Sequence, residues 1–212
     1  MPLDPRSDTG ATRFFVLDGL DGVGKSTQQR LLCRWLEERG QQVVACRDPG
    51  STGLGETIRS VLLAREGVAI DRRAEMLLYM AARAQLVEEI VRPALLAGKT
   101  VVSDRFLLAN VVYQGHAGGL DVDEIWGVGR VATGGLEPTL VLLLDMAPDA
   151  AAGRIRRERD RMEEQGDEFR RRVREGFLTE AAKNRERIVV INAARSIDDV
   201  QADIRAAVEK FL

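Results

Sequence analysis

The run Gly19-Leu20-Asp21-Gly22-Val23-Gly24-Lys25-Ser26 decides the fold class of this chain. It matches the phosphate-binding loop pattern of a glycine, any four residues and then Gly-Lys-Ser. The apolar stretch Arg13–Leu17 lies just before it and a helix-forming segment follows, which is the strand–loop–helix context that such a loop requires. The motif therefore predicts that the chain binds a nucleoside triphosphate.

The residue types in this loop suit an anionic ligand. Gly19, Gly22 and Gly24 let the backbone turn and approach phosphates closely, so that amide N–H groups and the positive end of the next helix face the anion. Lys25 can reach the β and γ phosphates, and the Ser26 hydroxyl can bind Mg²⁺.

Length and composition favour one ordinary globular domain. The chain has 212 residues, of which 45% are hydrophobic and 30% charged. Its net charge of −2 argues against a surface that binds nucleic acid. Cys33 and Cys46 lack metal-ligand spacing, so a reducing cytoplasm is the expected location. No stretch of about 18 apolar residues occurs, so we expect no membrane span.

The N-terminal residues 1–12 are polar and lack the apolar core of a signal peptide. They are predicted to be a disordered extension. A single domain is then expected over residues 13–212.

Short apolar runs alternate with longer amphipathic segments along the whole domain, which predicts βαβ units around a parallel sheet. The fold class is therefore α/β, a three-layer sandwich with a five-stranded parallel sheet flanked by helices. The expected strands are Arg13–Leu17, Gln42–Cys46, Thr100–Ser103, Leu140–Leu144 and Ile188–Ile191. The expected helices are Lys25–Arg39, Leu54–Ala64, Arg72–Ala97, Val122–Thr133, Ala150–Arg157, Glu168–Asn184 and Ile197–Phe211.

Polar residues follow the first three predicted strands. The phosphate loop comes after the first, the turn Arg47–Thr52 after the second, and Asp104-Arg105-Phe106 after the third. Because ligands of open parallel sheets collect at the carboxyl ends of the strands, these turns should meet at one edge.

Two aspartates end buried strands and are candidates for the metal. Asp104 is the preferred Mg²⁺ ligand and Asp145 its competitor. For either one the alternative is a helix cap or a salt bridge. Arg105 offers a planar guanidinium that suits a phosphate, although it could simply pair with Asp104.

The base of a nucleotide has candidate partners too. Tyr79 and Arg83 are four residues apart in a predicted helix and so project from the same face, where they could stack on a base and bind its edge. They could equally be a core tyrosine covered by an arginine whose head reaches the solvent. Asn110 lies among apolar residues and needs a partner, either a base edge or the backbone.

Two arginine clusters follow the fourth strand. The second cluster, in the helix from Glu168, favours a solvated helix face with ion pairs. The first cluster lies where a mobile lid could bring an arginine to a transferring phosphoryl group. Its members are Arg154, Arg156, Arg157, Arg159 and Arg161. His116, in a glycine-rich segment interpreted as a loop, is given no catalytic role.

Together these features resemble the thymidylate kinase family of P-loop nucleoside monophosphate kinases, from about Phe14 to the C-terminus. The matching elements are the loop Gly19 to Thr27, the turn Arg47-Asp48-Pro49-Gly50, Tyr79 with Ala81-Ala82-Arg83-Ala84-Gln85, Asp104-Arg105-Phe106, Tyr113-Gln114-Gly115, and Asp160-Arg161-Met162-Glu163.

The resemblance implies transfer of the γ-phosphate of ATP to dTMP, with Mg²⁺, by a homodimer with a short lid at about 153–167. The implied ATP-binding residues are Gly19, Leu20, Asp21, Gly22, Val23, Gly24, Lys25, Ser26 and Thr27. The implied dTMP-binding residues are Asp21, Arg59, Tyr79, Arg83, Arg105, Asn110 and Tyr113.

Individual roles also follow from the resemblance. Asp21 would accept a hydrogen bond from the sugar 3′-hydroxyl, and Arg105 with Arg59 would hold the 5′-phosphate of the acceptor. Tyr79 would stack on thymine and Tyr113 would crowd the 2′ position. Lys25 and Arg105 with a lid arginine would be catalytic, and Ser26 with Asp104 would hold the metal.

The chain departs from the family pattern at several positions. Asp18 stands where glutamate is usual, Phe106 where tyrosine or histidine is usual, and Ala109 where serine is common. The lid is short before Asp160 and lacks the usual glycine there. The alternatives left open are a kinase of another pyrimidine nucleotide or nucleoside, a nucleotide-binding switch, and an inactive binding module.

Overall fold

The computed structural model describes residues 13–64, 69–155 and 166–212. Its sheet has five parallel strands in the order β2-β3-β1-β4-β5. The strands are β1 (Phe14–Asp18), β2 (Val43–Arg47), β3 (Thr100–Asp104), β4 (Leu140–Asp145) and β5 (Ile188–Asn192). The predicted fold class is confirmed.

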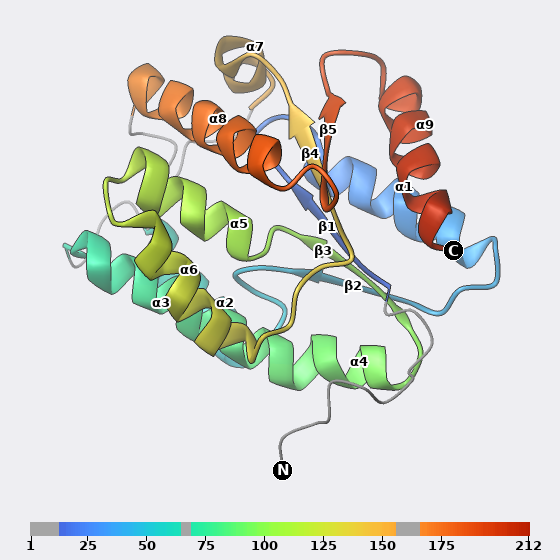
Figure 1. Cartoon of the computed structure of the whole chain (residues 1–212), viewed down its shortest axis with the longest axis horizontal. Helices are drawn as coiled ribbons and strands as arrows, with labels where there is room; N and C mark the ends of the chain where they lie inside the picture. The colour runs from blue at the N-terminus through green and yellow to red at the C-terminus, as the bar shows by residue number, and fades with distance from the viewer. Residues whose placement is uncertain (1–12, 65–68, 156–165) are drawn as a thin grey trace.

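Helices cover both faces of the sheet and make the three layers (Figure 1). α1 and α9 pack together on one face, while α4 and α8 contact the other. The described helices are α1 (Lys25–Glu37), α2 (Gly53–Leu63), α3 (Arg72–Leu86), η1 (Val87–Val91), α4 (Arg92–Leu96), α5 (Leu107–Asn110), η2 (Val111–Ala117), α6 (Val122–Thr133), α7 (Pro148–Gly153), α8 (Gly166–Lys183), α9 (Ile197–Val208) and η4 (Glu209–Phe211).

Each strand ends one residue later than its apolar pattern predicts. The extra residue is polar in every case, for example Asp18 in β1 and Asp104 in β3. The backbone ladder continues through it, since Arg47 pairs in register with Asp104, because strand pairing uses main-chain groups rather than side chains. The sheet thus carries polar side chains at its carboxyl edge.

The central strand β1 places the phosphate loop at the middle of the carboxyl edge of the sheet. All five of its residues are buried, and it pairs with β3 on one side and β4 on the other. Apolar side chains on both faces explain this central place, since a strand covered by helices on both sides exposes none of them.

The long helix predicted over 72–97 is divided by a wider turn. α3 ends at Leu86, the π-helical turn η1 spans Val87–Val91, and α4 follows. Pro93 is the second residue of α4. Because proline lacks an N–H and its ring crowds the carbonyl four residues earlier, a regular α-helix would clash here.

The segment around His116 is helical, so the loop interpretation was wrong. α5 runs directly into the π-helical η2, which contains His116. Val111 and Val112 are completely buried and anchor this helix in the core. Gly115 indicated a loop, but it lies so close to Val122 that a Cβ atom would be 3.1 Å from its side chain. The glycine serves close packing rather than a turn.

Side-chain caps fix several helix starts where the sequence places short polar residues. The side chains of Thr52, Asp71, Asp121 and Ser196 accept hydrogen bonds from backbone N–H groups in the first turns of α2, α3, α6 and α9. α7 begins at Pro148, a residue type that suits the first helical turn.

The predicted N-terminal extension 1–12 and most of the predicted lid lie outside the described residues. Within the ranges that the structure describes, no helix combines the length and apolar character needed to cross a membrane.

Candidate active site

The phosphate loop connects β1 to α1 and depends on glycine. Gly19 and Gly22 have φ values of 133° and 87°, in the region that favours glycine. A Cβ atom at these positions would lie 2.4 Å from the carbonyl oxygen of Leu144 and 2.1 Å from that of Ala151. The loop can therefore lie against these neighbouring backbones only without side chains, and α1 then starts at Lys25.

The loop borders a polar cavity of about 580 Å³. The lining residues are Asp21, Gly22, Gly24, Lys25, Ser26, Thr27, Arg47, Asp48, Arg59, Asp104, Arg105, Arg154 and Ile155. Of the loop residues predicted to bind ATP, Gly19, Leu20 and Val23 do not line it, and Leu20 and Val23 are buried. These two apolar side chains anchor the loop in the core.

Lys25 is folded back over the loop. Its Nζ donates hydrogen bonds to the carbonyl oxygens of Gly19 and Leu20 at 3.2 and 2.7 Å, and to Asp21 Oδ1 at 3.2 Å. The ammonium group is thus held at the wall of the cavity, where a phosphate would be its natural partner.

Ser26 and Asp104 are brought together from α1 and β3. Ser26 Oγ donates to Asp104 Oδ2 at 2.8 Å, and Asp104 is 7% exposed. No three His, Cys, Asp or Glu side chains gather as a metal cluster within the described ranges. A hydroxyl and one carboxylate fit Mg²⁺, which takes oxygen ligands and is commonly completed by substrate phosphates and water.

Asp145, the competing metal candidate, has a different partner. Its two carboxylate oxygens accept hydrogen bonds from Arg174 at 2.7 and 2.8 Å. This ion pair links β4 to α8, as the salt-bridge alternative predicts, and Asp145 does not line the polar cavity.

Arg105 lies at the centre of the site. Its Nη1 donates to Asp18 Oδ1 at 3.1 Å, and its Nη2 donates to Asp21 Oδ1 at 2.7 Å and to the Tyr113 hydroxyl at 3.2 Å. Burial would lower the pKa of the guanidinium, but the facing oxygens, first that of Asp21, raise it well above its ordinary value. The alternative pairing with Asp104 does not occur.

The backbone at Arg105 is strained. Its φ of 69° lies in the left-handed region, which costs a residue with a side chain roughly 1 kcal/mol. The Arg105 N–H donates to the carbonyl of Leu17 at 2.9 Å, and its carbonyl accepts from Ser103 Oγ at 2.7 Å. These contacts hold the conformation that turns the guanidinium toward the loop.

The two carboxylates beside Arg105 have opposite electrostatic environments. Asp18 is completely buried, and burial raises its pKa to about 6, although Arg105 and Lys25 oppose the shift. At Asp21 burial acts in the same direction, but Arg105 and Lys25 outweigh it and hold the pKa well below its usual range. Asp18 was not among the predicted site residues, although it directly precedes the loop.

This environment predicts how Asp18 affects stability. Its folded pKa of about 6 lies above the ordinary 3.8, so its favourable contribution is complete below about pH 4 and is lost as the pH rises through 6. As the pH rises from 4 to 7, we expect the free energy of unfolding of Asp18→Asn to increase by about 2 to 3 kcal/mol relative to that of wild type. Urea unfolding of both proteins across this pH range measures the difference in their free energies of unfolding. A difference that does not change with pH would contradict the raised pKa of Asp18.

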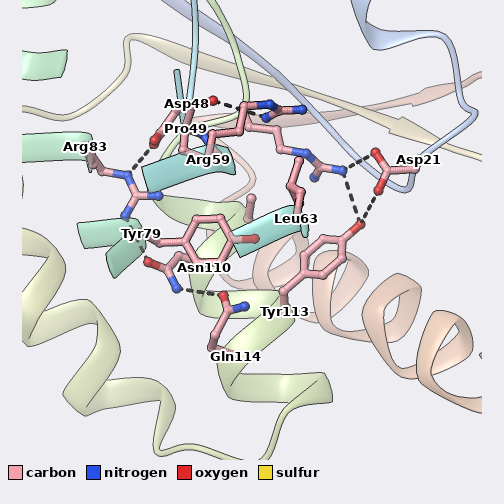
Figure 2. A pocket seen from close by; sticks show the side chains of 12 residues that line it. Asp21, Asp48, Pro49, Arg59, Leu63, Tyr79, Arg83, Asn110, Tyr113 and Gln114 are labelled. Atoms are coloured by element: carbon pink, nitrogen blue, oxygen red, sulfur yellow. Dashed lines mark hydrogen bonds and ion pairs between the residues drawn. The ribbon is translucent and has the colours of Figure 1, made fainter. Parts of the chain in front are cut away.

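A second pocket adjoins the polar cavity on the side of α3 and η2 (Figure 2). Its lining residues are Asp21, Asp48, Pro49, Arg59, Leu63, Tyr79, Arg83, Arg105, Ala109, Asn110, Tyr113 and Gln114. It therefore contains all seven residues predicted to bind the acceptor nucleotide. Asp21, Asp48, Arg59 and Arg105 line both spaces, so the pocket and the cavity meet there.

Arg83 turns inward and does not reach the solvent over Tyr79. It is 1% exposed, and its Nε donates to Asp48 Oδ2 at 2.6 Å (Figure 2). The alternative of an arginine covering a core tyrosine is therefore wrong. Asp48 is 2% exposed and supplies the opposite charge that a buried guanidinium needs.

Asn110 pairs with side chains rather than with the backbone. Its Oδ1 accepts from Arg83 Nη1 at 3.1 Å, and its Nδ2 donates to Gln114 Oε1 at 2.7 Å. Asp48 and Gln114 were missed as site residues, although both lie in the motifs that carry the family resemblance. The signal that could have found Gln114 is a polar residue four positions after Asn110.

Arg59 and Tyr113 close the pocket near the cavity. Arg59 Nη1 donates to the carbonyl of Pro49 at 3.2 Å, and burial, helped by Arg47, lowers its pKa. The Tyr113 hydroxyl also contacts Asp21 Oδ2 at 3.5 Å, and burial raises the pKa of this phenol. Arg59 thus brings positive charge to the point where the two spaces meet.

The two predicted arginine clusters have different surroundings. Arg154 lines the polar cavity and donates to the carbonyl of Ala193 at 3.2 Å, while Arg156, Arg157, Arg159 and Arg161 lie outside the described residues. In the second cluster, Arg170 and Arg171 pair with the acidic residues three positions earlier, as a solvated face predicts. His116 binds Glu180 at 2.9 Å and lines neither space.

The fold and these two joined spaces define a P-loop phosphotransferase with an acceptor pocket beside its triphosphate loop. The family model described as thymidylate kinase matches residues 17–204. Thymidylate kinase of Symbiobacterium thermophilum is 44% identical, covering 94% of both chains. That of Clavibacter sepedonicus is 47% identical over 91% of this chain and 92% of its own. The chain therefore belongs to the thymidylate kinase family, whose members are ATP-dependent nucleoside monophosphate kinases.

A solved structure gives the same result. The crystal structure of thymidylate kinase from Ehrlichia chaffeensis superposes with a TM-score of 0.77 at 28% identity, covering 92% of this chain and 97% of that one. Thymidylate kinase of Rhodopirellula baltica is 44% identical over 94% of this chain and 80% of its own.

Proposed function

We propose that this chain transfers the γ-phosphate of ATP to the 5′-phosphate of dTMP, giving ADP and dTDP. The observation that carries the proposal is the junction of the two spaces at Asp21, Arg59 and Arg105. A triphosphate on the loop and a monophosphate in the pocket would there meet beside fixed positive charge. The substrate pair is supported by the similarity to thymidylate kinases.

The nucleotide sites are assigned on the same basis. ATP would lie on residues 19–27 with Lys25 at its β and γ phosphates. Ser26 and Asp104 would hold Mg²⁺, which neutralises charge on the phosphates when it is bound. Arg154 borders the cavity as the candidate lid arginine, and the other four lid arginines remain proposals.

The acceptor would lie in the pocket with its phosphate on Arg105 and Arg59. Tyr79 would stack on the base, while Arg83 and Asn110 would bind its polar edge. Tyr113 would lie against the sugar at its 2′ position. Asp21 would accept from the 3′-hydroxyl through Oδ2, whose contact to Tyr113 is long, at 3.5 Å.

The chemistry requires alignment more than proton transfer. An oxygen of the dTMP phosphate attacks the γ-phosphorus, the bond from that phosphorus to the β-phosphate oxygen breaks, and ADP leaves. The attacking oxygen belongs to a dianion near neutral pH, so no strong base is needed. Lys25 and Arg105 both donate to Asp21 Oδ1, so their positive charges lie close together, where they can stabilise the charge of the transition state.

The test is an ADP-release assay with ATP and a panel of acceptors: dTMP, dUMP, dCMP, dGMP and thymidine. We expect dTMP to have the highest kcat/KM, above dUMP by about tenfold, since one methyl group in a pocket gives discrimination of that size. Preference for another acceptor would change the substrate assignment. ADP release independent of any acceptor would favour a nucleotide-hydrolysing switch.

The homodimer remains a proposal as well. Leu54 and Val61 of α2, Leu77 of α3 and Val131 of α6 are large exposed apolar residues on three neighbouring helices. Exposed apolar residues gathered on neighbouring helices support a contact between two copies of the chain. This group includes α3, which is part of the helix 72–97 for which we propose the contact. A monomer in sedimentation equilibrium at micromolar concentration would contradict the dimer.

The domain division and the cellular location complete the proposal. We propose one kinase domain over 13–212, preceded by the extension 1–12 and carrying a lid at 153–167. Both cysteines are free, which supports a reducing cytoplasm.

A further inference from the structure

A chain of buried side-chain hydrogen bonds crosses the back of the acceptor pocket. Gln114 Nε2 donates to Glu75 Oε1 at 2.8 Å, Asn110 Nδ2 donates to Gln114 Oε1 at 2.7 Å, and Arg83 Nη1 donates to Asn110 Oδ1 at 3.1 Å. All four residues are at most 6% exposed. We call Glu75, Gln114, Asn110 and Arg83 the amide relay.

The relay can run in only one direction. A carboxylate accepts hydrogen bonds and a guanidinium donates them, so Glu75 and Arg83 fix the two ends. The two amides between them must both turn their NH₂ groups toward Glu75 and their oxygens toward Arg83. Reversing the Asn110 amide would place its NH₂ against the Arg83 donors and its oxygen against the Gln114 oxygen, which leaves buried polar groups unsatisfied.

This direction determines what the pocket presents to a base. Arg83 offers the Nη2 N–H that does not face the Phe106 carbonyl, and Asn110 offers an oxygen whose second lone pair can accept. Thymine and uracil carry a carbonyl beside a ring N–H, which complements this pair. Cytosine carries an amino group beside an unprotonated ring nitrogen, which would place donor against donor and acceptor against acceptor.

We propose that Glu75 and Gln114 are positioning residues that set the direction of the Asn110 amide and thereby favour bases with a carbonyl beside a ring N–H. The inference rests on the proposed function, because it requires a pyrimidine monophosphate in the pocket. Glu75 does not line the pocket and acts on it through Gln114, which does. Through Gln114, the carboxylate of Glu75 on α3 thus affects which base Asn110 on α5 can bind.

A merely structural role would be to fasten η2, and the chain offers a matched control for it. Glu180 on α8 is 2% exposed and binds the same helix from another side, through His116 at 2.9 Å. It lines neither space of the active site. Glu180→Gln therefore loosens η2 in the same chemical way without touching the relay.

The first experiment exchanges the two relay groups. Gln114→Glu places two carboxyl groups where the donor and acceptor are 2.8 Å apart, and we expect KM for dTMP to rise about 30-fold. Adding Glu75→Gln restores a donor between them and keeps an acceptor for Asn110. The double variant should return KM to within about threefold of wild type.

The second experiment measures selectivity. Gln114→Met removes the acceptor that turns the Asn110 NH₂ away from the base, so kcat/KM for dTMP relative to dCMP should fall about tenfold. KM for ATP should stay unchanged in the same variant. Glu180→Gln should leave the dTMP to dCMP ratio within about twofold of wild type.

The outcomes separate the two proposals. Wild type that transfers no phosphate to dTMP overturns the proposed function and this inference together. If the wild type is active on dTMP, three results would each overturn the relay alone. The double variant could fail to restore KM for dTMP, or Gln114→Met could keep the dTMP to dCMP ratio of kcat/KM. The third is that Glu180→Gln lowers this ratio as much as Gln114→Met does.

Discussion

Arg105→Ala is expected to lower kcat/KM for dTMP by about 1,000-fold, because it removes the cation shared by the triphosphate cavity and the acceptor pocket. Arg105→Lys should recover only part of this loss, since an ammonium keeps the charge but cannot bridge Asp18, Asp21 and a phosphate as a planar fork does. Steady-state kinetics in both substrates measure the effect.

The Arg105 variants need a control for folding, because the guanidinium also neutralises the buried Asp18. Arg34→Ala is suitable, since Arg34 is exposed on α1 and lines neither space. Melting temperatures show whether each variant is folded at the assay temperature. A folded Arg105→Ala protein with activity within about tenfold of wild type would remove Arg105 from the catalytic role.

Lys25→Met should lower kcat by about 100- to 10,000-fold with a smaller effect on KM for dTMP. The lysine lies on the triphosphate loop and does not line the acceptor pocket, so its loss acts on the transferring phosphate. Methionine keeps the aliphatic stem and so separates loss of the charge from loss of packing. Turnover at saturating concentrations of both substrates is the measurement.

Lys210→Met is the matched control, because Lys210 is exposed near the C-terminus and lines neither space. The Lys25 ammonium also binds two loop carbonyls, so the variant tests the loop as well as the chemistry. A direct measurement of ATP binding separates these effects. Turnover close to wild type would show that the loop lysine does not act on the transferred group.

Much of the site follows from the sequence because its backbone needs are local. The glycines of the phosphate loop, the strand before it and the helix after it lie within one short stretch. The parallel sheet can also be predicted from the sequence, since its buried strands are short and apolar. Together they predict that Asp104 and Arg105 lie beside the loop, and Ser26 does meet Asp104 at 2.8 Å.

The partners of the buried polar groups could not be predicted in this way. Helical spacing places Tyr79 and Arg83 on one face but says nothing of whether Arg83 reaches the solvent or turns inward. It turns inward because Asp48, 35 positions earlier, is buried against it. Likewise, Glu75 reads as an ordinary residue of a helix start, and only its contact with Gln114, 39 positions away, gives it a role.

The helix over 107–117 was missed for a related reason. Gly115, followed by Gly118 and Gly119, indicates a loop when each residue is considered alone, yet Gly115 is needed where another helix passes too close for a side chain. The burial of Val111 and Val112 then favours the helix over the loop.

The loop, the sheet class and the family could be recognised from the chain alone, because these depend on residues adjacent along the chain and on repeating apolar patterns. The tertiary structure decided which carboxylate faces which arginine, which way the Asn110 amide points and that two separate spaces join at Arg105. Those choices follow from satisfying charges and hydrogen bonds after burial, between residues that only folding brings together.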